Sequence, residues 1–388
     1  MTEPESQPAP QKRRPLLPVA VVVIAVAGVV FWFTRPEPLP DGVGPEIFAK
    51  ATEQFRNQYD REPDRIDVLS FAGELAAVDG RNEDAAACFA AIPSEHPEYG
   101  LSARLQEGYV LLKLNRAAAA EKSLREFLTL AARTPGVAPE HVFSARKQLA
   151  FLLSVELRIE ERQSVLRAAH ESGAVDVFDS KQFFFPHLLI WNSETGSKRL
   201  ARFLEVDPTN RLLRLAEARY VASRGQLEKA IRQLDSVLGE RPDDVRAASA
   251  LLECFFDADD WVRFNDLYKM FPDYQVAEPW LMTRMRGHRE MHNKDWETAA
   301  ERFRQVLAAD GTNPWAQSGL ARALKKMGKN EAAEEAAARS AVIAKIRVNL
   351  GRGDGRESLE ALAQDCENIG LPEAAAVFRQ HAKSFERK

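Results

Sequence analysis

The feature that most constrains this chain is a pattern that occurs twice between residues 280 and 344, with a period of 34 residues. The small residues Gly287 and Ala299 of the first copy correspond to Ala321 and Ala333 of the second. These spacings are typical of two helices that approach closely where small residues meet. Because such a hairpin cannot bury its apolar face alone, neighbouring copies must stack. The pattern therefore predicts an all-α chain of stacked hairpins.

The same register can be followed through most of the sequence. Units are predicted to start near Ile66, Leu101, Phe143, Val177, Arg211, Val245, Trp280, Pro314 and Arg356. The two longest steps between starts coincide with turn-rich insertions at 134–139 and 351–355. Residues 45–62 precede the first unit and are typical of one amphipathic helix, which we expect to cap the row.

A period of 34 with small residues at two helix positions and a bulky apolar residue soon after resembles the tetratricopeptide repeat (TPR). The resemblance implies a right-handed α-solenoid whose first helices line a concave groove. It implies a TPR-like solenoid over residues 45–350 and a C-terminal TPR-like unit over 351–388. Arg162, Phe184 and Pro186 depart from the pattern, so we expect altered helix angles and a break in the superhelix around 177–200.

Turns within the hairpins are marked by glycine, which adopts a positive φ at little cost. We expect such turns at Gly80, Gly225, Gly328 and Gly370. Small residues in the first helices, such as Gly287, are expected to let the second helices approach. Bulky residues such as Phe303 are expected to fill the space between hairpins.

Residues 16–33 are uncharged and almost wholly apolar, which predicts a transmembrane helix. As a helix they would span roughly 27 Å, and insertion would gain roughly 4–7 kcal/mol. Lys12, Arg13 and Arg14 precede the segment, whereas only Arg35 follows closely. The positive-inside rule then places a disordered tail, residues 1–15, in the cytoplasm. The solenoid would be extracytoplasmic, and periplasmic in a bacterium.

Two other readings of the N-terminus stay open. A cleaved signal peptide is one, although the apolar stretch is long and lacks a small-residue cleavage site. The reverse orientation, with the solenoid in the cytoplasm, is the other. Prolines alternate in residues 34–44, which predicts a semi-rigid spacer between membrane and solenoid.

The composition argues against several function classes. A formal net charge of −4 gives no whole-chain argument for nucleic acid as a partner. The three cysteines are far apart in sequence, so no disulfide framework is implied. No nucleophile elbow is present, and the glycine-rich stretch 351–355 follows no strand. We therefore expect no cofactor and no enzymatic activity.

Candidate partner-binding residues fall in the predicted groove and form a basic and an apolar stretch. They are Arg284, His288, His292, Arg322, Lys325, Lys326, Phe178 and Phe185. Arginine binds carboxylates with two parallel hydrogen bonds, which favours a protein or peptide partner, an acidic one among the options. The alternatives are a solvated helix face for the basic stretch and core packing for the aromatic one.

Two further functions compete with a non-catalytic membrane-anchored scaffold. His288 and His292 are four residues apart and share a helix face, so a metal-dependent hydrolase is one alternative. That function would need a third ligand, and Arg289 stands where a metalloprotease motif has Glu. The other alternative is a structural envelope protein that associates with itself.

Overall fold

The computed structural model describes residues 40, 42–172, 176–187, 194–271, 278–350 and 355–386. All regular structure in these ranges is helical, and they contain no strand. The predicted tail 1–15, the membrane segment 16–33 and most of the spacer 34–44 lie outside them. None of the described helices combines the length and hydropathy that a bilayer crossing requires.

The helices follow one another as antiparallel hairpins. A single helix, α2 (Pro45–Gln58), precedes the row within the predicted range 45–62 and buries Phe48, Ala51 and Phe55. The first helices are α3 (Arg65–Val78), α5 (Gly100–Lys113), α7 (Pro139–Val155), α9 (Val177–Phe184), α11 (Arg211–Ser223), α13 (Val245–Asp257), α15 (Trp280–His292), α17 (Pro314–Lys326) and α19 (Arg356–Asn368). The predicted unit starts from residue 177 onward are the first residues of their helices.

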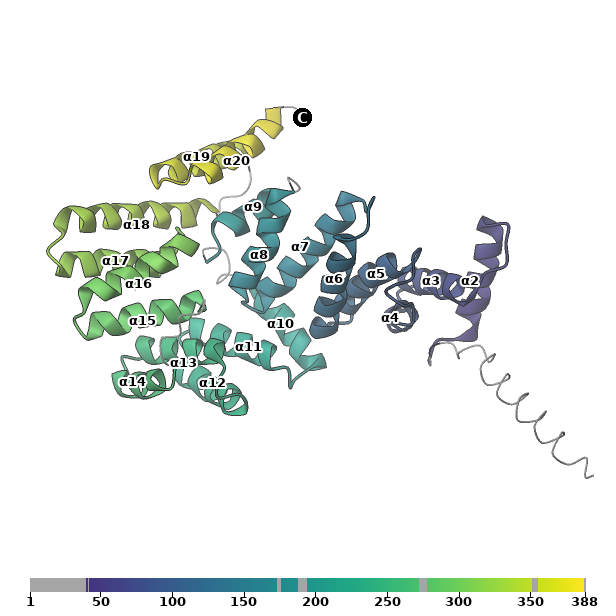
Figure 1. Cartoon of the computed structure of the whole chain (residues 1–388), viewed down its shortest axis with the longest axis horizontal. Helices are drawn as coiled ribbons and strands as arrows, with labels where there is room; N and C mark the ends of the chain where they lie inside the picture. The colour runs from purple at the N-terminus through teal and green to yellow at the C-terminus, as the bar shows by residue number, and fades with distance from the viewer. Residues whose placement is uncertain are drawn as a thin grey trace, which may run out of the picture.

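The second helices are α4 (Asn82–Ala90), α6 (Ala117–Ala131), α8 (Ile159–Glu171), α10 (Glu194–Val206), α12 (Leu227–Glu240), α14 (Trp261–Lys269), α16 (Trp296–Ala309), α18 (Asn330–Leu350) and α20 (Pro372–Lys383). They pack against the first, except that α10 contacts α7 and α11 rather than α9. A short 3-10 helix, Ser384–Glu386, follows the last of them. Figure 1 shows the row starting at α2 and curving through α11–α18 until α19 and α20 lie beside α9.

Local side-chain chemistry explains why the first helices start where they do. Asn210, Asp244 and Asn313 each stand one residue before a helix and accept hydrogen bonds from its first free backbone amides. A cap of this kind stabilises a helix by about 1 kcal/mol. The period thus sets the spacing of the units, and the capping residue sets the boundary.

In the described ranges, eight hairpin turns share the same backbone conformation. The four predicted glycines have positive φ, from 70° at Gly370 to 78° at Gly225. The same place in other units holds a residue with a side chain and a positive φ: Asn115 (59°), Leu157 (55°), Asp259 (54°) and Lys294 (66°). The left-handed residue is therefore a requirement of the hairpin, and glycine only one way to meet it.

The predicted irregularity around 177–200 is present. Pro186 disfavours helical backbone in the residue before it, so α9 ends after eight residues at Phe184. The chain then runs into the C-terminal half, where Thr312 Oγ1 donates to the Phe184 carbonyl at 3.3 Å. Arg162, which is buried, donates to the Pro186 carbonyl at 2.8 Å. The three residues that depart from the repeat pattern, Arg162, Phe184 and Pro186, therefore lie together where α8 and α9 meet the C-terminal half.

Candidate functional site

A pocket of about 570 Å³ lies where α13–α17 meet, and we call it the outer pocket. It contains most of the predicted basic stretch together with aromatic side chains. Its lining is Phe256, Trp261, His288, Met291, His292, Trp296, Arg322, Lys325 and Lys326. Residues from the predicted first helices α13, α15 and α17 contribute most of it, as expected for the concave face.

Aromatic rings build one wall of the outer pocket. His288 stacks on Phe256 with ring centroids 4.1 Å apart, and His292 stacks on Trp261 at 3.8 Å. Trp261 is held in turn by its indole N–H, which donates to Asp259 at 2.8 Å. These contacts give a rigid, partly apolar surface.

Cations form the other wall, on α17. Arg322, Lys325 and Lys326 are exposed, and none has an ion pair with any described residue. Arg284 differs: it is 5% exposed, pairs with Glu253 and lies 4.8 Å over the Trp315 ring. The free positive charge of the predicted basic stretch is therefore on α17, and Arg284 belongs to a neutralised pair.

His288 and His292 do not form a metal site with other described residues. Among the described ranges, no group of three or more His, Cys, Asp or Glu side chains is placed to hold an ion. His288 is buried, and this burial, with the nearby charges of Arg284 and Arg322, lowers its pKa to about 3. It is neutral at physiological pH and serves as a packing residue between Phe256 and Phe303.

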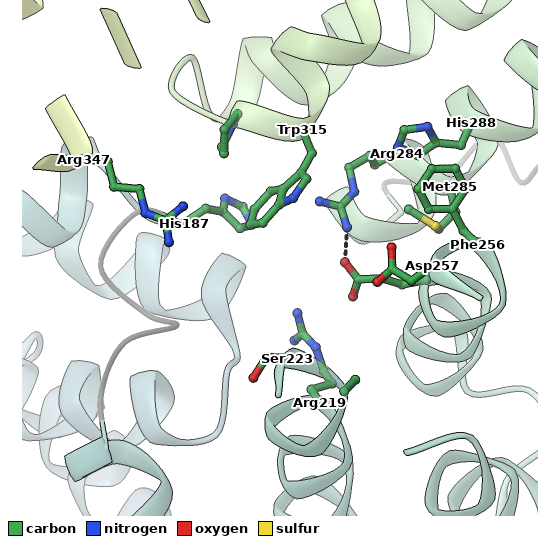
Figure 2. A pocket seen from close by; sticks show the side chains of 13 residues that line it. His187, Arg219, Ser223, Phe256, Asp257, Arg284, Met285, His288, Trp315 and Arg347 are labelled. Atoms are coloured by element: carbon green, nitrogen blue, oxygen red, sulfur yellow. Dashed lines mark hydrogen bonds and ion pairs between the residues drawn. The ribbon is translucent and has the colours of Figure 1, made fainter. Parts of the chain in front are cut away.

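A second, smaller cavity of about 240 Å³ adjoins the outer pocket and shares Phe256 and His288 with it; we call it the inner cavity. Figure 2 shows Arg219 and Ser223, Trp315, Arg347 and His187 facing it from different elements. Its full lining is His187, Arg219, Ala222, Ser223, Glu253, Phe256, Asp257, Arg284, Met285, His288, Pro314, Trp315 and Arg347. It lies at the centre of the curved C-terminal half.

Of the two predicted aromatic groove residues, one is exposed and the other is buried. Phe178 is 56% exposed on α9 and lines neither the outer pocket nor the inner cavity. The prediction for Phe185 is wrong, because its side chain is 0% exposed and stacks on Phe378 at 5.7 Å. Pro186 ends α9 and turns this ring into the core, so the alternative of core packing holds here.

Sequence reasoning missed the tryptophans of the outer pocket. Trp261 and Trp296 each stand at the first position of a second helix. Both occupy the same position of consecutive units, sixteen residues after the starts at Val245 and Trp280. A comparison of units position by position could have found them.

Residues 290–341 match the family model described as tetratricopeptide repeat. The matched stretch runs from the end of α15 through α16 and α17 into α18, and it contains the cations of the outer pocket on α17. No curated protein matches this sequence.

Solved structures with similar helix arrangements have low sequence identity. A tetratricopeptide repeat protein from Parabacteroides merdae is 15% identical, with 67% of this chain and 98% of that chain covered and a TM-score of 0.33. The human IFIT1 dimer with m7Gppp-AAAA is 11% identical, with 89% and 96% covered and a TM-score of 0.38. The APC/C hetero-tetramer Cut9–Hcn1 is 12% identical, with 94% and 78% covered and a TM-score of 0.32. Because these TM-scores are low, the solved structures carry no further argument, and the likeness to the tetratricopeptide repeat rests on the match over residues 290–341.

Proposed function

This chain belongs to the tetratricopeptide repeat family through residues 290–341, and from that premise we propose that it is a non-catalytic scaffold. It binds a protein or peptide partner through an acidic segment with an apolar anchor. The binding site is the outer pocket, and the chain is held at a membrane by residues 16–33.

The observation that carries this proposal is the pairing of an aromatic wall with unpaired cations. Arg322, Lys325 and Lys326 have no described carboxylate to neutralise them, so their charge is available to a ligand. Charge of this kind raises the association rate and selects the partner, whereas burial of apolar groups supplies much of the affinity. Trp261 and Trp296 are the half-buried surfaces on which an apolar anchor can pack.

The test is a binding titration with a blocked peptide of Glu and Asp around one central Phe, followed by tryptophan fluorescence. The double variant Arg322→Glu/Lys325→Glu reverses two cations three residues apart on α17 and is expected to weaken binding at least about tenfold at low salt. Lys229→Glu/Arg232→Glu is the matched control, since it reverses two exposed cations three residues apart on α12.

Two results would overturn the proposal. One is equal affinity of the wild type and the α17 variant, with the same dependence on salt. The other is preferential binding of a single-stranded RNA oligonucleotide at the same cations, which would point to a different class of partner.

The membrane attachment has its own support and its own test. Residues 16–33 carry no charge over a length that suits a bilayer, and the basic residues 12–14 precede them. The full chain is expected to stay with the membrane fraction after alkaline carbonate extraction, and protease added outside intact cells is expected to digest the solenoid. Release by carbonate contradicts the anchor, and protection of residues 45–388 contradicts the orientation.

A further inference from the structure

The lining of the inner cavity includes two exposed, opposite charges that form no ion pair with any described residue. Asp257, the last residue of α13, has no hydrogen bond or ion pair, and the same holds for Arg347 on α18 among the described ranges. Figure 2 shows the two side chains on opposite sides of the cavity, with Trp315 between them. An unpaired carboxylate and an unpaired guanidinium thus face the same small space.

The other charges of the cavity are already engaged. Glu253 pairs with Arg284, whose guanidinium lies 4.8 Å over the Trp315 ring. Arg219 donates to the Leu157 carbonyl at 3.0 Å. His187 contacts Asp310 at 2.5 Å, and burial lowers the pKa of His288. Asp257 and Arg347 are therefore the two charged lining residues without a described partner, and we call them the two poles of the cavity.

The surroundings of Asp257 favour a cationic neighbour. Desolvation raises the pKa of this carboxyl, the charge of Glu253 raises it further, and the charge of Arg284 offsets part of this increase. An ammonium group placed beside Asp257 would offset the repulsion between these two carboxylates. At the other pole, Arg347 presents a planar fork that matches a carboxylate.

The size of the cavity limits what can enter it. Its volume of about 240 Å³ is below the range of about 300–1,000 Å³ that is usual for drug-sized ligands. Trp315, 40% exposed, offers an indole surface against which an apolar side chain can pack. A ligand of one or two residues fits these limits.

We propose that the inner cavity binds a zwitterionic ligand, a free amino acid or a dipeptide, with its ammonium group at Asp257 and its carboxylate at Arg347. The ligand's apolar side chain lies against Trp315. This site is separate from the cations of α17, so it does not rest on the proposed scaffold function.

The test uses isothermal titration of the full chain in detergent with each of the common free amino acids and with the dipeptide Gly-Phe. At least one of these probes is expected to bind. Its N-acetylated and C-amidated forms, each of which removes one charge, are expected to bind at least tenfold more weakly. If a free amino acid binds, the site accepts single amino acids. If only Gly-Phe binds, the site requires a dipeptide.

Two conservative variants locate the poles. Asp257→Asn is expected to weaken the free probe at least tenfold but to leave the N-acetylated probe unchanged. Arg347→Gln is expected to weaken the free probe at least tenfold but to leave binding of the C-amidated probe unchanged. The double variant Lys229→Gln/Asp243→Asn, at exposed positions away from the cavity, is the control.

Clear outcomes overturn the proposal. They are equal binding of charged and doubly blocked probes, no binding by any free amino acid or by Gly-Phe, or unchanged affinity in both pole variants. The acidic-peptide titration of the α17 variants is measured separately, so failure at one site is distinguishable from failure at the other.

Discussion

At the scale of single residues, the turn inside each hairpin requires a left-handed backbone from whatever residue stands there. A side chain in this conformation costs roughly 1–2 kcal/mol, whereas glycine adopts it freely but loses more chain entropy on folding. Gly328 and Lys294 occupy this place in adjacent units, with φ of 76° and 66°. Both residues are exposed, so the conformational free energy of the backbone should determine the effect of a substitution at either position.

We therefore expect Lys294→Gly to stabilise the fold by about 0.5–1 kcal/mol and Gly328→Ala to destabilise it by about 1–2 kcal/mol. Urea unfolding followed by circular dichroism measures both. Gly239→Ala is the control, because Gly239 lies inside α12 with open space around an added Cβ. It should stabilise by about 0.5–1 kcal/mol, so loss of stability in Gly239→Ala or in Lys294→Gly would contradict this account.

A second residue-scale prediction concerns His288. Its pKa is lowered to about 3 in the folded chain, against about 6.5 in the unfolded chain. Between these values only the unfolded chain takes up the proton, so this residue destabilises the fold progressively as pH falls below about 6.5. His288→Phe should gain about 2 kcal/mol over the wild type between pH 7.5 and pH 5.

Unfolding free energies at the two pH values check this prediction. His288→Gln provides the control, because it removes the titrating group and also loses the stacking on Phe256. It should show the same gain on acidification from a lower starting stability. A wild-type pH dependence that persists in both variants would mean that His288 is not the responsible group.

The residue scale also shows what the sequence could and could not predict. Glycine marked the turns because its freedom at positive φ is a property of the residue itself. Nothing local marks Leu157 or Asp259 for the same conformation; only their phase in the repeat does. The burial of Phe185 was missed because it depends on Phe378, a contact far away in sequence.

At the scale of helices, small residues set how closely neighbours pack. Phe303 of α16 lies between Gly287 of α15 and Gly319 of α17. An added Cβ at Gly319 would lie 2.5 Å from the Cζ atom of Phe303, and one at Gly287 would lie 2.9 Å from its Cε1 atom. The ring therefore requires the absence of a side chain on both sides.

We expect Gly319→Ala to destabilise the fold by about 1–3 kcal/mol, because the ring and the helix must move apart. In the double variant with Phe303→Leu, the loss should be smaller than the sum of the two single losses, since a shorter side chain makes room for the Cβ. A double-mutant cycle in urea measures this coupling. Additive losses would show that Phe303 does not limit the spacing.

Helix positions were the most predictable part of the fold. The period and the capping residues Asn210, Asp244 and Asn313 are both local signals, and each places the same boundary. The outer pocket was predictable in part: its cations lie on one first helix, α17, which the repeat pattern places on the groove. Its depth and its aromatic wall depend on the angle between units, which no local pattern reports.

At the scale of the whole molecule, helices that are far apart in the row of hairpins contact each other. Helix α9 contacts α20, where Phe378 meets Phe184 edge to face at a centroid distance of 5.9 Å and stacks on Phe185 at 5.7 Å. Thr312 and Asp310 hold the segment that follows. A solenoid in which each unit touches only its neighbours would lack these contacts. The repeat pattern could not predict them, because they join residues that are 123 to 201 positions apart in sequence.

This junction predicts a specific pattern of local stability. Phe378→Ala removes a fully buried ring, with an expected loss of about 3–5 kcal/mol, and it removes the partner of α9 at the same time. Amide exchange is therefore expected to rise in residues 177–185 as well as around α20. Phe89→Ala, at a buried ring of α4, is the matched control and should raise exchange only near α3–α5. Loss of protection in α9 on Phe378→Ala would show that α9 and α20 stabilise each other. Unchanged exchange in α9 would mean that the two ends of the curve are stable without each other.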